Sequence, residues 1–189
     1  MNSGEVKVGE KIKQIRESMG FSLQELAERT GFSTAFISQI ENHLISPPLG
    51  ALIKVAHSLN VEIGKFFEQS GKAPFTIVRK HERTPTSRVA SKEGIRYGYS
   101  YESLAPDKIN RNMEPFLVTL EPESRKGVPY NHEGEEFIFV LEGRVEVQLA
   151  DYRDILEPGD SIYYDSSVPH RVSTADENIA RIIAVIYAS

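Results

Sequence analysis

The spacing of apolar residues changes once along this 189-residue chain, and that change constrains the fold more than any other feature of the sequence. Up to residue 68, apolar side chains recur every three or four positions, which is the spacing of amphipathic helices. From residue 75 onward they fall in short runs separated by glycine, proline and other turn formers. The sequence therefore predicts one helical domain followed by one built of strands.

The first 68 residues carry the end signals of five short helices. Ser22 followed by Glu25 is a capping-box pattern that opens the second helix, and Gly31 provides the turn after it. Ser33 caps the third helix, and Pro48 stands immediately before the fourth. The apolar residues expected at the helix contacts are Val8, Ile12, Ile15, Met19, Leu23, Leu26, Ala27, Phe36, Ile37, Ile40, Leu49, Leu52, Ile53, Ala56, Leu59, Ile63, Phe66 and Phe67.

The second and third of these helices have the pattern of two helices packed closely at a tight turn. The small residue Ala27 permits close approach, Gly31 permits the turn, and the branched residues Ile37 and Ile40 hold the second helix in place. Residues 22–43 resemble the lambda-repressor-like helix-turn-helix of the xenobiotic-response-element family nearly throughout.

This resemblance covers residues 8–68 and implies that residues 33–43 form a recognition helix in the major groove of DNA. Gln24, at the start of the preceding helix, is placed to meet a phosphate. The alternative interpretation is an ordinary solvated surface. The candidate DNA-binding residues are Gln24, Ser33, Thr34, Ala35, Ser38, Gln39 and Asn42.

Charge is unevenly distributed along the chain, whose formal net charge is −5. Residues 1–70 hold 7 basic and 8 acidic side chains, residues 71–115 hold 9 and 5, and residues 116–189 hold 6 and 14. The acidic C-terminal part repels phosphate, so DNA contacts must come from the N-terminal part. Because a single N-terminal domain with a net charge near zero binds DNA weakly, we expect a homodimer that forms through the C-terminal domain.

The second half of the chain has the pattern of an all-β domain. Many short strands at regular spacing are typical of a sandwich or barrel. We expect a linker at 69–75, and we expect residues 69–112 to comprise this linker and the first strands packed on the barrel. The expected strands are 75–78, 96–101, 116–120, 136–141, 144–149, 161–164 and 181–187.

Two short motifs within this half resemble those of the cupin family, over residues 113–188. Glu136 and Gly143 are separated by six residues, and Gly159 precedes His170 in the second motif. In the family's first motif, His132 matches the second histidine, while Tyr130 stands in place of the first. The resemblance implies a double-stranded β-helix barrel.

The same residues have the chemistry of a metal site. Tyr130, His132 and Glu136 are separated by even numbers of positions, so their side chains can face the same interior. His170 would join them from a later strand. Two imidazoles and one carboxylate with open coordination positions suit iron(II), manganese, nickel or zinc. Tyr130 is expected to be a weak fourth ligand or a hydroxyl facing a bound molecule. A metal-free pocket remains the alternative, since one of the four family ligands is replaced.

Several aromatic residues near these positions are expected to pack in the domain rather than to bind a ligand. They are Tyr97, Tyr99, Tyr101, Phe139, Tyr163 and Tyr164.

Together, the two resemblances imply a two-domain α+β transcriptional regulator of bacterial type. Residues 1–68 would bind a double-stranded DNA operator. Residues 113–189 would sense a small-molecule effector and form the homodimer. Effector binding would act by favouring one arrangement of the two heads.

The alternative is an enzyme. Hydroxypropylphosphonic acid epoxidase, a non-haem iron oxygenase, joins a similar head to a cupin whose metal triad matches His132, Glu136 and His170. That enzyme carries a phosphonate-binding lysine where this chain has Gly20 and an asparagine where it has Pro129. We therefore expect no enzymatic activity. A dimerisation barrel without a ligand is a third possibility.

The composition excludes several other classes of protein. The chain has no cysteine, which excludes disulfides and thiolate metal sites. It has no stretch resembling a signal peptide and no apolar run long enough to span a bilayer. We expect a cytoplasmic protein without membrane contact.

Overall fold

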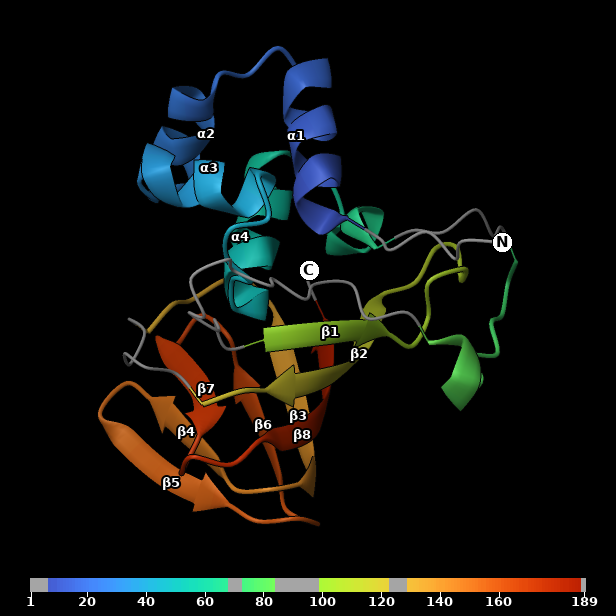
Figure 1. Cartoon of the computed structure of the whole chain (residues 1–189), viewed down its shortest axis with the longest axis vertical. Helices are drawn as coiled ribbons and strands as arrows, with labels where there is room; N and C mark the ends of the chain where they lie inside the picture. The colour runs from blue at the N-terminus through green and yellow to red at the C-terminus, as the bar shows by residue number, and fades with distance from the viewer. Residues whose placement is uncertain (1–6, 68–72, 84–98, 123–128, 188–189) are drawn as a thin grey trace.

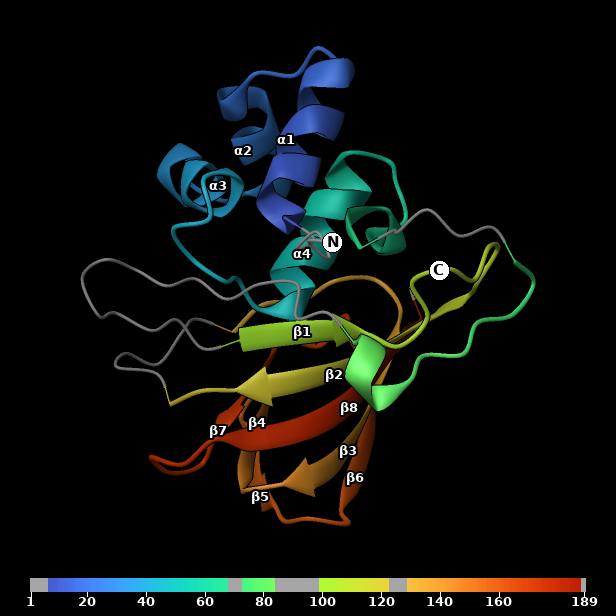
Figure 2. The same cartoon turned by 45° about the vertical axis from the view of Figure 1, so that its right-hand side comes forward.

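A computed structural model of the chain describes residues 7–67, 73–83, 99–122 and 129–187. A helical domain lies on one end of a domain built of strands (Figures 1 and 2). We call residues 7–67 the helical domain and residues 99–187 the β domain. No helix among the described residues is long and apolar enough to cross a membrane.

The helical domain contains four α-helices and one short 3-10 helix. Five short helices were expected, and the fifth is the short 3-10 helix η1. The bounds are α1 Val8–Ser18, α2 Leu23–Thr30, α3 Thr34–Glu41, α4 Leu49–Ser58 and η1 Ile63–Phe66.

The predicted helix ends are confirmed. The Ser22 hydroxyl accepts a hydrogen bond from the Glu25 amide at 3.1 Å, and the Ser22 amide donates to the Glu25 carboxylate at 2.7 Å. Ser33 caps α3 in the same way, and Gly31 has a φ of 67°, which few residues other than glycine adopt readily. Pro48 precedes α4 and supplies no side-chain cap.

The helices pack around an apolar core that contains most of the residues expected there. Ile12, Leu26 and Ile37 are fully buried, whereas Met19 is 41% exposed and does not belong to the core. A buried ion pair joins α1 to α3, with Arg16 Nε and Nη2 lying 2.7 and 2.8 Å from the two carboxylate oxygens of Glu41.

The β domain consists of two antiparallel sheets. Their strand orders are β1-β2-β8-β3-β6 and β5-β4-β7. Most of the buried apolar residues of both sheets belong to one hydrophobic cluster. The bounds are β1 Tyr99–Ser103, β2 Met113–Leu120, β3 Glu135–Glu142, β4 Val145–Leu149, β5 Tyr152–Leu156, β6 Ser161–Asp165, β7 His170–Thr174 and β8 Ala180–Tyr187.

One strand expectation is wrong, one is tested only in part, and one strand was missed. Residues 75–78 form no strand: the chain makes an isolated bridge at Ala73 and then the 3-10 helix η2, Lys80–Glu82. The strand expected at 96–101 is described only from Tyr99, because residues 96–98 lie outside the described residues. No strand was predicted at β5, whose first four residues are all exposed.

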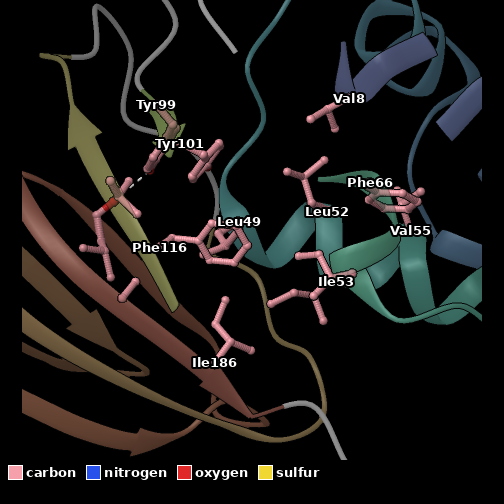
Figure 3. Close-up of a cluster of buried hydrophobic side chains, with 14 of the residues drawn as sticks. Val8, Leu49, Leu52, Ile53, Val55, Phe66, Tyr99, Tyr101, Phe116 and Ile186 are labelled. Carbon is pink, nitrogen blue, oxygen red and sulfur yellow. Dashed lines mark hydrogen bonds between the residues drawn. The ribbon is translucent and has the colours of Figure 1, made fainter. Parts of the chain in front are cut away.

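The two domains share a packed boundary centred on the start of α4. Ser46 Oγ donates a hydrogen bond to the Tyr99 carbonyl at 2.5 Å, and the Tyr101 hydroxyl donates to the Pro47 carbonyl at 2.7 Å. Leu49 and Phe116 belong to the same buried cluster, which continues from one domain into the other (Figure 3). The packing roles expected for Tyr99 and Tyr101 are thus confirmed, and the expected residue Tyr97 lies outside the described residues.

Candidate functional site

Three residues from separate parts of the β domain bring their ligand atoms together. One ligand atom from each of His132, Glu136 and His170 lies within 4.8 Å of the others, and all three residues are buried. Their exposed fractions are 7%, 5% and 0% respectively. The structure therefore brings together the residues that the sequence singled out.

Backbone pairing positions these side chains. Tyr130 and His170 exchange two backbone hydrogen bonds of 3.0 and 2.8 Å, so the segment before β3 is held against the start of β7. Two residues later, the His132 amide donates to the Ser166 carbonyl at 3.0 Å. His132 lies in the loop before β3 rather than in a strand, and Glu136 is the second residue of β3.

Hydrogen bonds fix the orientation of both imidazole rings. Nδ1 of His132 lies 2.9 Å from the carbonyl oxygen of Glu133, and Nδ1 of His170 lies 2.8 Å from that of Val168. A carbonyl only accepts, so each Nδ1 carries the proton and each Nε2 presents a lone pair. Neither Nε2 has a hydrogen-bond partner among the described residues. This is the arrangement of a metal-binding histidine, in which the second nitrogen is held by a backbone carbonyl.

Glu136 completes the set. Its Oε2 accepts a hydrogen bond from the Tyr164 hydroxyl at 2.7 Å and lies 3.7 Å from Nε2 of His170. Burial raises the pKa of Glu136 to about 7, and burial lowers the pKa of His132 to about 4 and that of His170 in the same direction. Each shift reflects the cost of placing a charge in an apolar setting without a counter-charge.

A divalent cation fits this donor set. It would supply the counter-charge that the buried carboxylate of Glu136 lacks. The unpaired Nε2 atoms of His132 and His170 would coordinate it through their lone pairs. The cupin-type triad of His132, Glu136 and His170 can therefore bind a metal. Two nitrogen donors and one oxygen donor suit iron(II), manganese, nickel or zinc and do not by themselves select one of them.

Tyr130 packs against the triad through its ring. The ring lies edge-on to that of His170, with centroids 4.6 Å apart. The ring also lies against Gly50 of α4, where an added Cβ would lie only 2.0 Å from Cε2 of Tyr130. The Tyr130 ring thus lies between the triad and the helical domain.

Tyr164 is a site residue that the sequence analysis assigned to packing. It is buried, and it stands opposite Glu136 in the pairing of β3 with β6. Tyr163, also expected to pack, is instead 64% exposed and donates a hydrogen bond to Glu135. The alternation of faces along a strand could have separated the two tyrosines, had the register with β3 been known.

The predicted recognition helix α3 lies at one side of the helical domain, and α2 lies farther from the sheets than α3 does (Figures 1 and 2). All seven candidate DNA-binding residues are at least partly exposed, with Ser38 half-buried. Ser33 is engaged in the cap of α3, and the Asn42 amide donates to the Ser38 carbonyl at 2.8 Å. Thr34 and Gln39 make no side-chain hydrogen bond to any described residue, so both are available to a partner.

Comparisons with known proteins support both halves of this description. A helix-turn-helix family model matches residues 12–66, and a cupin domain model matches residues 116–186. The HTH-type transcriptional regulator PuuR of Escherichia coli (strain K12) is 25% identical over 178 residues, covering 93% of this chain and 92% of the relative. A crystal structure of an HTH_3 family transcriptional regulator from Vibrio cholerae superposes with a TM-score of 0.64 at 23% identity, covering 98% and 97% of the two chains.

The comparisons also include an enzyme. (S)-2-hydroxypropylphosphonic acid epoxidase of Streptomyces wedmorensis is 26% identical over 189 residues, covering 93% of each chain. The likeness extends across both domains, so it bears on the architecture of the whole chain.

Proposed function

The chain belongs to the helix-turn-helix transcriptional regulators that carry a C-terminal cupin domain. We propose that a small molecule controls its binding to DNA. The chain is a DNA-binding transcriptional regulator, and it is not an enzyme. We place the DNA-binding domain at 1–68, a connecting segment with the first strands at 69–112, and the sensor domain at 113–189. A regulator of this kind acts in the bacterial cytoplasm, where its operator is found.

The helical domain reads the operator through α3. The observation that carries this proposal is the exposed, unengaged pair Thr34 and Gln39, whose donors and acceptors suit base edges. Ser38 and Ala35 add contacts on the same helix. Gln24, Ser33 and Asn42 are placed for the phosphate backbone, which fixes position without reading sequence.

The β domain joins two copies. A homodimer presents two recognition helices to two half-sites, which offsets the weak positive charge of each head. Exposed apolar side chains on the edge strand β5, Tyr152 and Ile155, support an interface there, because an open strand edge is usually covered.

We further propose that His132, Glu136 and His170 hold a divalent metal, iron, manganese, nickel or zinc. When bound, the metal supplies Lewis acidity and open positions for an effector. Tyr164 holds the carboxylate of Glu136 in place, and the two backbone carbonyls hold the imidazoles. The effector changes operator affinity by binding one arrangement of the domains more tightly than another.

A triple replacement tests the DNA-reading proposal. Thr34→Ala, Ser38→Ala and Gln39→Ala are combined, and binding to the promoter region of the protein's own gene is measured by fluorescence anisotropy. Each lost base-edge contact should cost about 1–3 kcal/mol. The melting temperature should hardly change, because none of the three side chains belongs to the core.

Gln14→Ala provides the matched control, since Gln14 is exposed on α1. The control should bind the operator as the unmodified protein does. Unchanged operator affinity in the triple variant would show that α3 does not read the DNA.

A further inference from the structure

The strands of the five-stranded sheet follow one another from β1 to β6 down the molecule in Figure 2, and the outward face of this sheet is apolar. Side chains alternate between the two faces along each strand. Ala184 and Ile186 of β8 lie in the hydrophobic cluster with Phe116, so they point into the β domain. Ile183 and Val185 therefore point outward. By the same alternation and register, the outer face consists of Met113, Pro115, Leu117, Phe137, Phe139, Tyr163, Ile183, Val185 and Tyr187.

The centre of the outer face is made of two adjacent rows of paired residues that carry no charge. From β6 to β2, the rows are Tyr163, Phe137, Val185, Pro115 and Ser161, Phe139, Ile183, Leu117. The charged residues of this face stand around the two rows. Glu135 and Asp165 lie at one end, Glu142 and Arg181 lie at the other, and Glu102 lies on the edge strand β1. An apolar centre with a charged rim is typical of a protein–protein interface.

The side chains of the outer face do not belong to the core of the β domain. None of the nine is part of the hydrophobic cluster, and of the nine only Leu117 is buried. Met113 and Tyr163, on opposite sides of the face, are 61% and 64% exposed. Single exposed apolar side chains are common on folded domains, but a contiguous apolar patch marks a docking surface.

The area of the outer face approaches what a stable dimer needs. Strands β2, β8 and β3 have eight residues each, and β6 extends the face by one more strand. At about 4.8 Å between strands and about 3.4 Å per residue, the face covers roughly 500 Å² before the relief of the side chains is counted. A dimer interface of standard size buries about 800 Å² of each copy. The β5 edge offers only the exposed apolar side chains of Tyr152 and Ile155, so a contact there is secondary.

We propose that the outer face binds the outer face of a second copy of this chain. The pairing rests on the homodimer proposed above and assigns its main contact to the five-stranded sheet. A face that meets its own copy must not bring like charges together. The centre carries no charge, and a two-fold axis that runs across the strands turns the acidic end with Glu135 and Asp165 toward the Arg181 end of the other copy. The two acidic ends then do not meet.

The charge of the β domain disfavours other large occupants of this face. Residues 116–189 hold 6 basic and 14 acidic side chains. An anionic lipid surface or a nucleic acid would therefore be repelled. A second copy is also acidic, but an apolar centre keeps most of these charges out of the contact.

Lysine substitutions in the full-length protein test the pairing. Val185→Lys places an ammonium at the centre of the outer face, where two copies would bring two ammonium groups together. Tyr163→Lys places one where the side chain is exposed and the Glu135 carboxylate is adjacent, so folding should be retained. Measured by sedimentation equilibrium, the dissociation constant of the dimer should rise at least about a hundredfold for Val185→Lys and about tenfold for Tyr163→Lys. Tyr152→Lys is the matched control on β5, with 58% exposure against 64% for Tyr163, and should leave the constant unchanged.

The outcomes separate the interface from the homodimer itself. A dimer that survives Tyr163→Lys but dissociates in Tyr152→Lys would move the contact to β5 and overturn the proposal, while the homodimer would stand. A dimer that all three variants leave intact would overturn it as well. An unmodified protein that sediments as a monomer would sink both the pairing and the homodimer, and would leave the outer face to a different protein. Far-UV circular dichroism checks that each variant is folded, and the result for Tyr163→Lys decides if Val185→Lys does not fold.

The absence of cysteine in the chain permits a direct check of position. The thiol introduced by Tyr163→Cys should react several-fold more slowly with a thiol reagent above the dissociation constant of the dimer than below it. The thiol introduced by Tyr152→Cys should react at the same rate at both concentrations. Equal rates for Tyr163→Cys would show that the outer face stays open in the dimer, and the proposal would be wrong.

Operator binding links the interface to function. Because two half-sites need two helical domains, Val185→Lys and Tyr163→Lys should weaken operator binding in fluorescence anisotropy, whereas Tyr152→Lys should not. Unchanged operator affinity in a variant that has become monomeric would contradict the need for a dimer. Failure of the unmodified protein to bind DNA would instead count against the regulator function, whatever the oligomeric state.

Discussion

Replacing Gly50 with alanine should destabilise the protein, although the same change stabilises most helices. Gly50 is the second residue of α4, and its backbone meets the ring of Tyr130. A Cβ at this position would lie 2.0 Å from Cε2 and 2.2 Å from Cδ2 of that ring, and 3.1 Å from Cδ2 of His132. Either the ring must leave its place beside His170, or α4 must move away from the β domain.

The two opposing effects have different magnitudes. In a helix free of this contact, Gly→Ala gains about 0.5–1 kcal/mol through the lower entropy of the unfolded chain. Forcing an additional carbon into a packed site costs about 1–3 kcal/mol. The clash should win because the nearest atoms belong to an aromatic ring. Subtracting the gain from the cost leaves a net loss of up to about 2.5 kcal/mol, which for a chain of this length corresponds to a decrease in melting temperature of up to about 10 °C.

A double-mutant cycle separates the clash from other causes. Unfolding in urea is measured for Gly50→Ala, Tyr130→Ala and the double variant. Removing the ring opens space for the new methyl group, so the double variant should be more stable than the sum of the single effects predicts, by about 0.5–3 kcal/mol. The reasoning fails if Gly50→Ala stabilises the unmodified protein, or if the two changes are additive.

The remaining predictions concern the metal site and the assembly. Zinc, manganese, nickel or iron(II) at a hundredfold excess over its dissociation constant should stabilise the protein by about 2.7 kcal/mol, and the combined His132→Ala and His170→Ala variant should show no such gain by calorimetry. Tyr164→Phe should fold but weaken metal affinity about 10–100-fold, as measured by competition with a chelator; unchanged affinity would mean that its hydrogen bond to Glu136 does not position the ligand. The full-length protein should sediment as a dimer, and a monomer at micromolar concentration would remove the basis for paired half-sites.

Much of the helical domain could be predicted because its signals are local. Ser22, Glu25 and Ser33 form caps that depend only on neighbouring residues, and Gly31 adopts the positive φ that the turn requires. The convergence of His132, Glu136 and His170 was also accessible, but through their resemblance to a motif rather than through local pattern. His132 itself lies in no strand, so strand parity alone would not have placed it.

The features that could not be predicted depend on contacts between residues far apart in the chain. Strand β5 is exposed nearly throughout, so it lacks the alternation of apolar and polar residues that marks a strand with one buried face. The packing of Leu49 and Phe67 of the helical domain on Phe116 of β2 required knowledge of how the two domains meet. The same is true of Gly50, which in the sequence is only one more helical residue.

Helix α4 links the two functions of the chain physically. Its first turn meets Tyr130 and His132 at Gly50, and one turn later the ammonium of Lys54 lies over the Phe32 ring, immediately before the cap of α3. A displacement of α4 by a ligand at the triad would therefore change both its contact with Tyr130 and its contact with Phe32. A tenfold change in operator affinity needs a difference of only about 1.4 kcal/mol between two arrangements. That amount is within the range expected from one misplaced aromatic contact at Gly50, so the interface is sensitive enough to serve as the switch.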